Sequence, residues 1–323
     1  MSTGENFYNI DNIIKSDHKY FIGYSHNEEN YSYLKWKTII TKEKFEVWSI
    51  GSSRVLQFRE NMFTGSFYNA GYTVTSIGDY MEFLKSIPKD KYPDVLLLGI
   101  DQWMFNENYD DLNYTRDSTY WKNSFVYFPK TNTYNAVITN FLSGKYSSLL
   151  NDINSDNKFV KKIGLNALVN NTGFRNDGSM YYGIQIKNLL NNNVATKDFG
   201  YKDTFKRIDE GNRKFQYGDS VNKFAIKKLD KLLKFCYKNN ISVIGFLPPF
   251  AEKVNVKMEE TKKAYERLKN AIQEYEILQK LPTDENFEED LYTEIQKAQS
   301  GFYSAMSDDF NTPEALASLF GLV

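Results

Sequence analysis

Three residues with chemical potential stand directly after apolar runs that have the length of β-strands. Ser53 follows the run at 45–50 through Gly51, Gly71 follows the run at 66–70, and Asp101 follows the run at 94–100. Ligands of parallel α/β sheets bind at the carboxyl ends of the strands, so we expect these residues to meet at one edge. Glycine lets backbone N–H groups approach a developing oxyanion, so the pattern favours chemistry in which such a charge forms.

A base that could activate a serine is hard to find in this sequence. The 323 residues include two histidines, His18 and His26, which both precede the first of these runs, so we expect neither to reach Ser53. A serine hydroxyl needs such a base to become a useful nucleophile. The single cysteine, Cys236, lies in an apolar helical stretch and predicts core packing. One cysteine excludes an internal disulfide and a cysteine-rich metal site, and we predict neither a metal nor a cofactor.

The elements that must position these residues are strands alternating with helices. Strands are predicted at 45–50, 66–70, 94–100 and 241–247, and helices at 80–87 and 222–238. Continuous apolar strands separated by helices are typical of a short parallel sheet covered on both faces. We therefore predict a three-layer α/β/α domain. The stretch at 106–220, rich in Asn, Tyr and Gly, is interpreted as loops mixed with short helices.

The composition changes near residue 255. Residues 256–323 contain 7 Lys+Arg and 14 Asp+Glu, whereas the whole chain carries a net charge of −1. Apolar residues there recur three and four apart, which predicts a helical hairpin, and Asn311-Thr312-Pro313-Glu314 predicts the start of a third helix. No signal peptide and no membrane-length apolar run is evident, so we expect a globular, cytoplasmic protein. The near-zero net charge gives no reason to expect a nucleic-acid or membrane partner.

Five blocks of the first part, taken in order, resemble one enzyme superfamily. They are the residues at 51–58, 67–71, 98–106, 173–179 and 247–250. Together they resemble the SGNH (GDSL-type) hydrolases, in particular a bacterial branch linked to cell-surface O-acylation. The resemblance covers about residues 20–257 and implies a flavodoxin-like α/β/α fold. It also implies an esterase or O-acyltransferase that acts on small or carbohydrate O-acyl groups.

The resemblance assigns a role to each site residue. Ser53 matches the nucleophile, and Gly71 with the Ser53 backbone N–H matches the oxyanion-hole donors. Asp101 stands where the family usually has an asparagine donor. An ionised carboxylate cannot donate a hydrogen bond, so Asp101 is either protonated or has another role, such as fixing loop geometry. Substrate contacts are assigned to Arg54, Asn69, Arg175 and Asp177.

Each of these assignments has a structural alternative. Ser53 could simply cap the following helix, since serine often takes that position. Gly71 and Gly99 could be turn glycines, and Arg175 with Asp177 could be a surface turn pair. The family also places an Asp-x-x-His loop after a fifth strand, and this sequence shows neither. We therefore expect at most weak esterase activity.

The end of the chain resembles a different protein family. Residues 302–316, together with the preceding helix around 264–268, resemble the helical region that follows the catalytic core of cysteinyl-tRNA synthetase. The signature motifs His-Ile-Gly-His and Lys-Met-Ser-Lys-Ser are absent from the chain, so aminoacylation is not expected. The acidic charge argues against contact with phosphate backbones.

The two resemblances meet near residue 258. We therefore predict an SGNH-like domain at 1–257 fused to a synthetase-like helical segment at 258–323, whose helices could cover the edge strand at 241–247. Three functions follow as hypotheses. The first is an impaired esterase or acyltransferase, the second a non-catalytic binding module with a protein partner for the acidic helices, and the third a synthetase-related fragment without aminoacylation activity.

Overall fold

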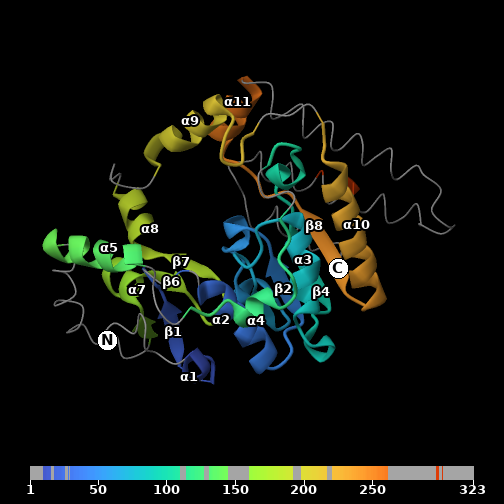
Figure 1. The fold of residues 1–323 in the computed structure, drawn as a ribbon, viewed down its shortest axis with the longest axis horizontal. Coiled ribbons are helices and arrows are strands. Elements are labelled where there is room, and N and C mark those ends of the chain that lie inside the picture. Colours follow the sequence, from blue (N-terminus) through green and yellow to red (C-terminus); the bar gives the residue numbers. More distant parts are fainter. Residues whose placement is uncertain are drawn as a thin grey trace. The chain divides into compact units, whose positions relative to one another are not determined.

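A computed structural model describes most of the first 260 residues (Figure 1). The described residues are 10–15, 18–25, 28, 30–109, 114–126, 131–144, 160–191, 198–216, 220–260, 296–297 and 300. The chain divides into two compact units, Met1–Ala271 and Ile272–Val323. Nearly all described residues belong to the first unit, and the following account concerns that unit. The helical hairpin and third helix predicted for the end of the chain lie outside the described residues, apart from short helical pieces at 296–297 and 300.

A four-stranded parallel sheet confirms the α/β class predicted from the apolar runs (Figure 1). Its strands are β2 (Val47–Ile50), β3 (Phe67–Asn69), β4 (Val95–Gly99) and β8 (Ser242–Phe246). They lie in the order β3-β2-β4-β8, and each neighbouring pair is parallel. All four strands fall within the ranges predicted from the sequence. In this order, β8 is an edge strand of the sheet.

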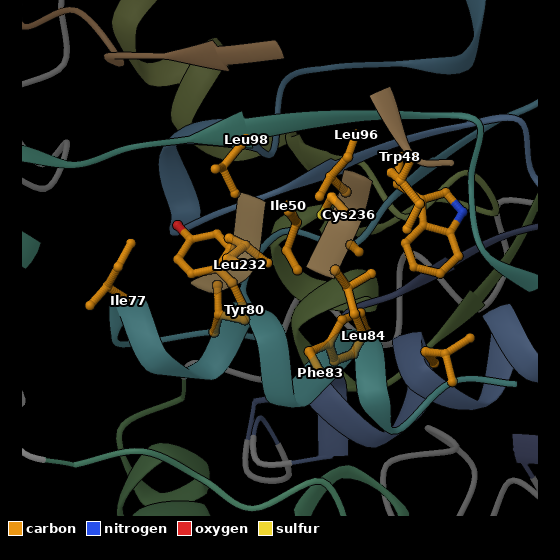
Figure 2. Close-up of a cluster of buried hydrophobic side chains, with 14 of the residues drawn as sticks. Trp48, Ile50, Ile77, Tyr80, Phe83, Leu84, Leu96, Leu98, Leu232 and Cys236 are labelled. Atoms are coloured by element: carbon orange, nitrogen blue, oxygen red, sulfur yellow. The ribbon is translucent and has the colours of Figure 1, made fainter. Parts of the chain in front are cut away.

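One face of this sheet packs against two helices, α3 (Ile77–Lys85) and α10 (Lys223–Lys238) (Figure 2). Side chains of β2 and β4 alternate between the two faces, which directs Trp48, Ile50, Leu96 and Leu98 towards these helices. Cys236 of α10 is fully buried in this core, so the predicted packing role is confirmed. Burial raises the pKa of its thiol to about 11, which keeps the thiol protonated at neutral pH.

The connection between β2 and β3 covers the opposite face. This segment, residues 51–66, contains two 3₁₀ helices, η1 (Ser53–Val55) and η2 (Glu60–Met62). The Phe63 ring stacks on Phe67 of β3 with 4.3 Å between centroids, and the Phe58 ring meets Phe246 of β8 edge-on at 5.2 Å. Aromatic side chains therefore fill this layer over β3 and β8, where the three-layer prediction expected an α-helix.

A second sheet was not predicted. It contains β1 (Lys19–Ile22), β5 (Val160–Ile163), β6 (Thr172–Phe174) and β7 (Met180–Tyr182), in the order β5-β1-β6-β7. β1 pairs in parallel with β5, whereas β6 is antiparallel to both β1 and β7. The interpretation of 106–220 as loops and short helices was therefore wrong for three short segments. Each has only three or four residues, and β5 and β6 pair with a strand near the start of the chain.

Helix α2 (Asn30–Thr41) packs against both sheets. Its Trp36 and Ile39 belong to the core of the parallel sheet, and its Tyr31 and Leu34 pack with Ile22 and Phe174 of the second sheet. The described residues also form the α-helices α1 (Ile10–Lys15), α4 (Tyr120–Asn123), α5 (Thr131–Leu142), α7 (Leu165–Asn170), α8 (Gly183–Leu190), α9 (Lys202–Glu210) and α11 (Glu252–Glu260). The 3₁₀ helices η3 (Lys89–Lys91), η4 (Gln102–Phe105) and η5 (Phe199–Tyr201) complete the set. Within the described ranges, none of the helices has the length and apolar character needed to span a bilayer.

Candidate active site at the carboxyl edge of the parallel sheet

The parallel sheet gathers the three residues with which the sequence analysis began. Strands β2, β3 and β4 are adjacent, and their carboxyl ends lead into Ser53, Gly71 and Asp101. A backbone hydrogen bond of 2.9 Å from Tyr72 N–H to Gly51 O joins the first two of these turns. The structure therefore brings the predicted serine, glycine and aspartate to one edge, where parallel sheets bind ligands.

Ser53 is exposed at this edge as the first residue of η1. The capping role belongs to its neighbour, because the hydroxyl of Ser52 accepts a hydrogen bond from Arg54 N–H at 3.3 Å. Ser52 is buried, whereas the Ser53 hydroxyl has no hydrogen-bond partner among the described residues. The hydroxyl that matches the nucleophile is thus the accessible one of the pair.

Gly71 has a packing role that accounts for the absence of a side chain. A Cβ atom at Gly71 would lie 2.4 Å from Cγ2 of Val55, and Cβ atoms at Gly51 and Gly99 would lie 2.7 and 2.5 Å from its Cγ1. Three glycines therefore surround one fully buried valine. The Gly71 N–H donates to Asn69 Oδ1 at 2.9 Å, so it would have to exchange this bond to serve as an oxyanion donor.

Asn69 holds the turn that carries Ser53. Its side chain is fully buried, and its Nδ2 donates to Val55 O at 2.7 Å and to Phe58 O at 3.0 Å. With Oδ1 bound to Gly71, both ends of the amide are used within the protein. The assignment of Asn69 as a substrate contact stays a prediction, and it would require these bonds to break.

Asp101 pairs with Arg54 at the centre of the edge. The two side chains form a salt bridge of 3.1 Å, and Asp101 is fully buried. Arg54 Nη2 donates to Pro249 O at 2.5 Å and also to Pro248 O, and the guanidinium lies 4.1 Å from the centre of the Phe250 ring. Arg54 therefore ties the end of β4 to the loop that follows β8.

Burial has the largest effect on the pKa values of Asp101 and Arg54. It raises the pKa of Asp101, although Arg54 and the Ser52 hydroxyl favour the charged carboxylate and oppose the rise. Burial likewise lowers the pKa of Arg54, against the pull of Asp101. Of the two roles that the sequence left open for Asp101, the salt bridge to Arg54 corresponds to the fixing of loop geometry.

Arg175 and Asp177 lie in the turn between β6 and β7. Oδ1 of Asp177 accepts bonds from the backbone N–H and the hydroxyl of Ser179, at 2.9 and 2.6 Å. Arg175 Nη1 donates to Ser179 Oγ and Met180 O, each at 3.1 Å. Asp177 O accepts the Asn69 N–H at 2.7 Å, which docks this turn on the end of β3. Both predicted substrate residues therefore lie beside the carboxyl edge and also stabilise their own turn.

Lys35 is a buried charged residue of this region that the sequence analysis missed. Its ammonium is buried and donates to Asn69 O at 3.0 Å and to Gly178 O at 2.8 Å, 4.3 Å from the centre of the Phe174 ring. Burial lowers its pKa well below the usual value, and the charge of Asp177 opposes this. The helical spacing of the sequence could have predicted that Lys35 is buried, because Lys35 shares a helix face with the buried positions 31, 34, 38 and 39.

Of the two histidines, His18 lies in the described part of the chain, and the expectation that neither reaches Ser53 stays a prediction. His18 is exposed just before β1, and its backbone carbonyl accepts a bond from Asn176 Nδ2 at 3.1 Å. No hydrogen bond joins His18 to Ser53. His26 lies outside the described residues.

Comparisons with known proteins concern the end of the chain. The DALR domain matches residues 301–323. Over 67 residues, 21% of this chain, the sequence is 88% identical to the cysteine–tRNA ligase of Sulfurihydrogenibium sp. (strain YO3AOP1) and 78% identical to that of Persephonella marina (strain DSM 14350 / EX-H1). Over 70 residues it is 53% identical to the cysteine–tRNA ligase of Aquifex aeolicus (strain VF5).

The matched stretch is a small part of these relatives. The chain covers 14% of the length of each ligase. No solved structure matches the chain. The comparisons thus support the synthetase-like segment that the sequence predicted, and the SGNH resemblance of the first part stays a prediction.

Proposed function

We propose that this chain is a fragment related to cysteine–tRNA ligase, joined to an α/β domain and lacking aminoacylation activity. The observation that carries the proposal is the 88% identity over 67 residues to a cysteine–tRNA ligase. The acidic charge of residues 256–323, with 7 Lys+Arg against 14 Asp+Glu, argues against contact of this segment with the phosphate backbone of tRNA.

Activation of cysteine would need residues that this chain does not contain. A His-Ile-Gly-His motif requires two histidines three positions apart, whereas His18 and His26 are the only histidines in the 323 residues. The Lys-Met-Ser-Lys-Ser motif is likewise absent. We therefore expect no cysteine-dependent ATP–pyrophosphate exchange and no cysteinyl-tRNA above a protein-free background. The Sulfurihydrogenibium ligase, assayed in parallel, is the positive control, and charging of tRNA by this chain would overturn the proposal.

A weak serine esterase is the second candidate function, and the exposed Ser53 hydroxyl favours it. Ser53 would attack the carbonyl carbon of a small or carbohydrate O-acyl ester, the ester C–O bond would break, and the alcohol would leave with the proton that the serine loses. Water would then hydrolyse the acyl-serine to the free acid and restore the hydroxyl. During the attack, the Ser53 N–H would face the oxyanion, together with Gly71 N–H once the latter leaves Asn69. Without an imidazole at the hydroxyl, proton removal is slow. The reaction requires no cofactor.

Ser53→Ala tests this second function directly. We expect slow hydrolysis of p-nitrophenyl acetate by the unchanged chain and none by Ser53→Ala, because the attacking oxygen is lost. Ser86→Ala is the matched control, since the Ser86 hydroxyl bonds to Phe83 O at the end of α3. Hydrolysis that survives in Ser53→Ala would remove Ser53 from the mechanism. If the unchanged chain neither hydrolyses the ester nor reacts with a fluorophosphonate probe, the α/β domain is a non-catalytic binding module.

A further inference from the structure

Two arginines from separate segments meet beside the β6–β7 turn. Gln57 Nε2 and Arg175 Nη1 both donate to Met180 O at 3.1 Å, and Met180 N–H donates to Leu56 O at 2.9 Å. The residues from 56 onward therefore run along this turn. Glu60 N–H donates to Asp177 Oδ2 at 3.0 Å, so the adjacent Arg59 also lies at the turn, close enough for its charge to act on the guanidinium of Arg175.

The two guanidinium groups repel each other, and the nearby carboxylate of Asp177 opposes this repulsion without forming an ion pair with either arginine. Burial, and next the charge of Arg59, lowers the pKa of Arg175, while Asp177 opposes the change. Within the described ranges, neither arginine forms an ion pair with a carboxylate. The carboxylate of Asp177 already accepts bonds from Glu60 N–H, Ser179 N–H and Ser179 Oγ.

Arg59 also has unused hydrogen-bonding capacity. Its Nε is buried and has no hydrogen-bond partner in the described part of the chain. An unpaired buried donor and two neighbouring cations are costly arrangements for a fold. Both side chains are only partly buried, so a ligand can reach them.

We propose that Arg59 and Arg175 form a binding site for the phosphate group of a small molecule. A phosphate monoester carries close to two negative charges, which neutralises both guanidinium groups, whereas a carboxylate carries one. Its oxygens also accept the paired N–H groups of arginine in a fixed geometry. The site does not depend on the chemistry of Ser53, and it gives Arg175 a ligand-binding role besides its contacts within the turn.

Calorimetric titration with inorganic phosphate, glycerol 1-phosphate and acetate at equal ionic strength tests the site. We expect both phosphates to bind and to raise the Tm, and acetate to do neither. Arg59→Gln should weaken binding about tenfold, the loss of one charge-assisted contact. Arg207→Gln should leave it unchanged, because Arg207 pairs with Asp203 on α9 at 3.1 Å. Binding of inorganic phosphate but not of the ester would place a free ion in the site and overturn the ester assignment.

Arg59→Gln also separates ligand binding from folding, since among the described residues the Arg59 side chain has no hydrogen-bond partner that the variant would lose. Without phosphate we expect its Tm to equal or exceed that of the unchanged chain, because the repulsion is relieved. A lower Tm together with no phosphate binding by the unchanged chain would show that the arginines serve the fold. Acetate binding as tight as phosphate binding would also overturn the proposal. Ser53→Ala should bind phosphate normally, which keeps this test independent of esterase activity.

Discussion

Asn69→Ala should lower the free energy of unfolding by about 3 kcal/mol or more. The variant removes the bonds of the buried amide to Val55 O, Phe58 O and Gly71 N–H. Val55 O keeps the bond from Phe58 N–H at 3.2 Å, so Phe58 O and Gly71 N–H are the groups left unsatisfied. Each unsatisfied buried group costs roughly 1 to 3 kcal/mol, and the vacated volume adds to the loss. Urea denaturation of the two proteins measures the difference.

Asn239→Ala is the matched control for this loss. Asn239 is partly buried at the end of α10, and its Nδ2 makes one bond of 2.8 Å, to Phe235 O. We expect this control to lose less than about 1 kcal/mol. A loss for Asn69→Ala that is no larger than the control would show that water replaces the three bonds and that Asn69 does not hold the turn.

Lys35→Met should remove a pH dependence from the stability of the protein. The pKa of Lys35 is lowered in the folded state, so the unfolded chain binds the extra proton between the folded pKa and about 10.4. The free energy of unfolding therefore rises with pH in that window, by at most about 1.4 kcal/mol per pH unit. Without the amine, this rise disappears.

Urea denaturation between about pH 7 and about pH 8.5 measures the slope. The thiol of Cys236 titrates in the unfolded chain near the top of this range, but its contribution is the same in all the proteins compared and cancels in the difference. Lys85→Met is the control, because Lys85 is exposed and its ammonium pairs with Glu82 at 2.7 Å. We expect this control to keep the slope of the unchanged chain. Equal slopes in all three proteins would mean that Lys35 is not desolvated as its burial indicates.

The sequence was informative wherever a local pattern decides the structure. The run that became β4, Val95-Leu96-Leu97-Leu98, is continuously apolar, as a strand buried on both faces requires. The runs of β2 and β8 are β-rich but are interrupted by serine or glycine. The Asn222 side chain accepts bonds from Phe224 N–H and Ala225 N–H, so the predicted helix at 222–238 begins with an effective cap.

Long-range contacts set the limit of prediction. The strands of the second sheet have three or four residues each, and β1 lies more than a hundred residues from its partners β5 and β6, so no local period marks them. The same holds for the candidate site. The strand pattern of the sequence predicted that Ser53, Gly71 and Asp101 lie at one edge. Only the structure shows that Gly71 N–H donates to Asn69 Oδ1 and that Asp101 forms a salt bridge with Arg54.

Position 101 has two possible roles that require different residues: a hydrogen-bond donor for the candidate site and a negative charge for the salt bridge with Arg54. An asparagine at 101 would offer an amide donor at the candidate site, yet it would withdraw the negative charge that holds the guanidinium. That guanidinium binds the carbonyls after β8, so the outermost strand would lose an anchor at the same time. A gain in catalytic capacity at this position is therefore coupled to a weaker sheet border, and selection for one opposes selection for the other.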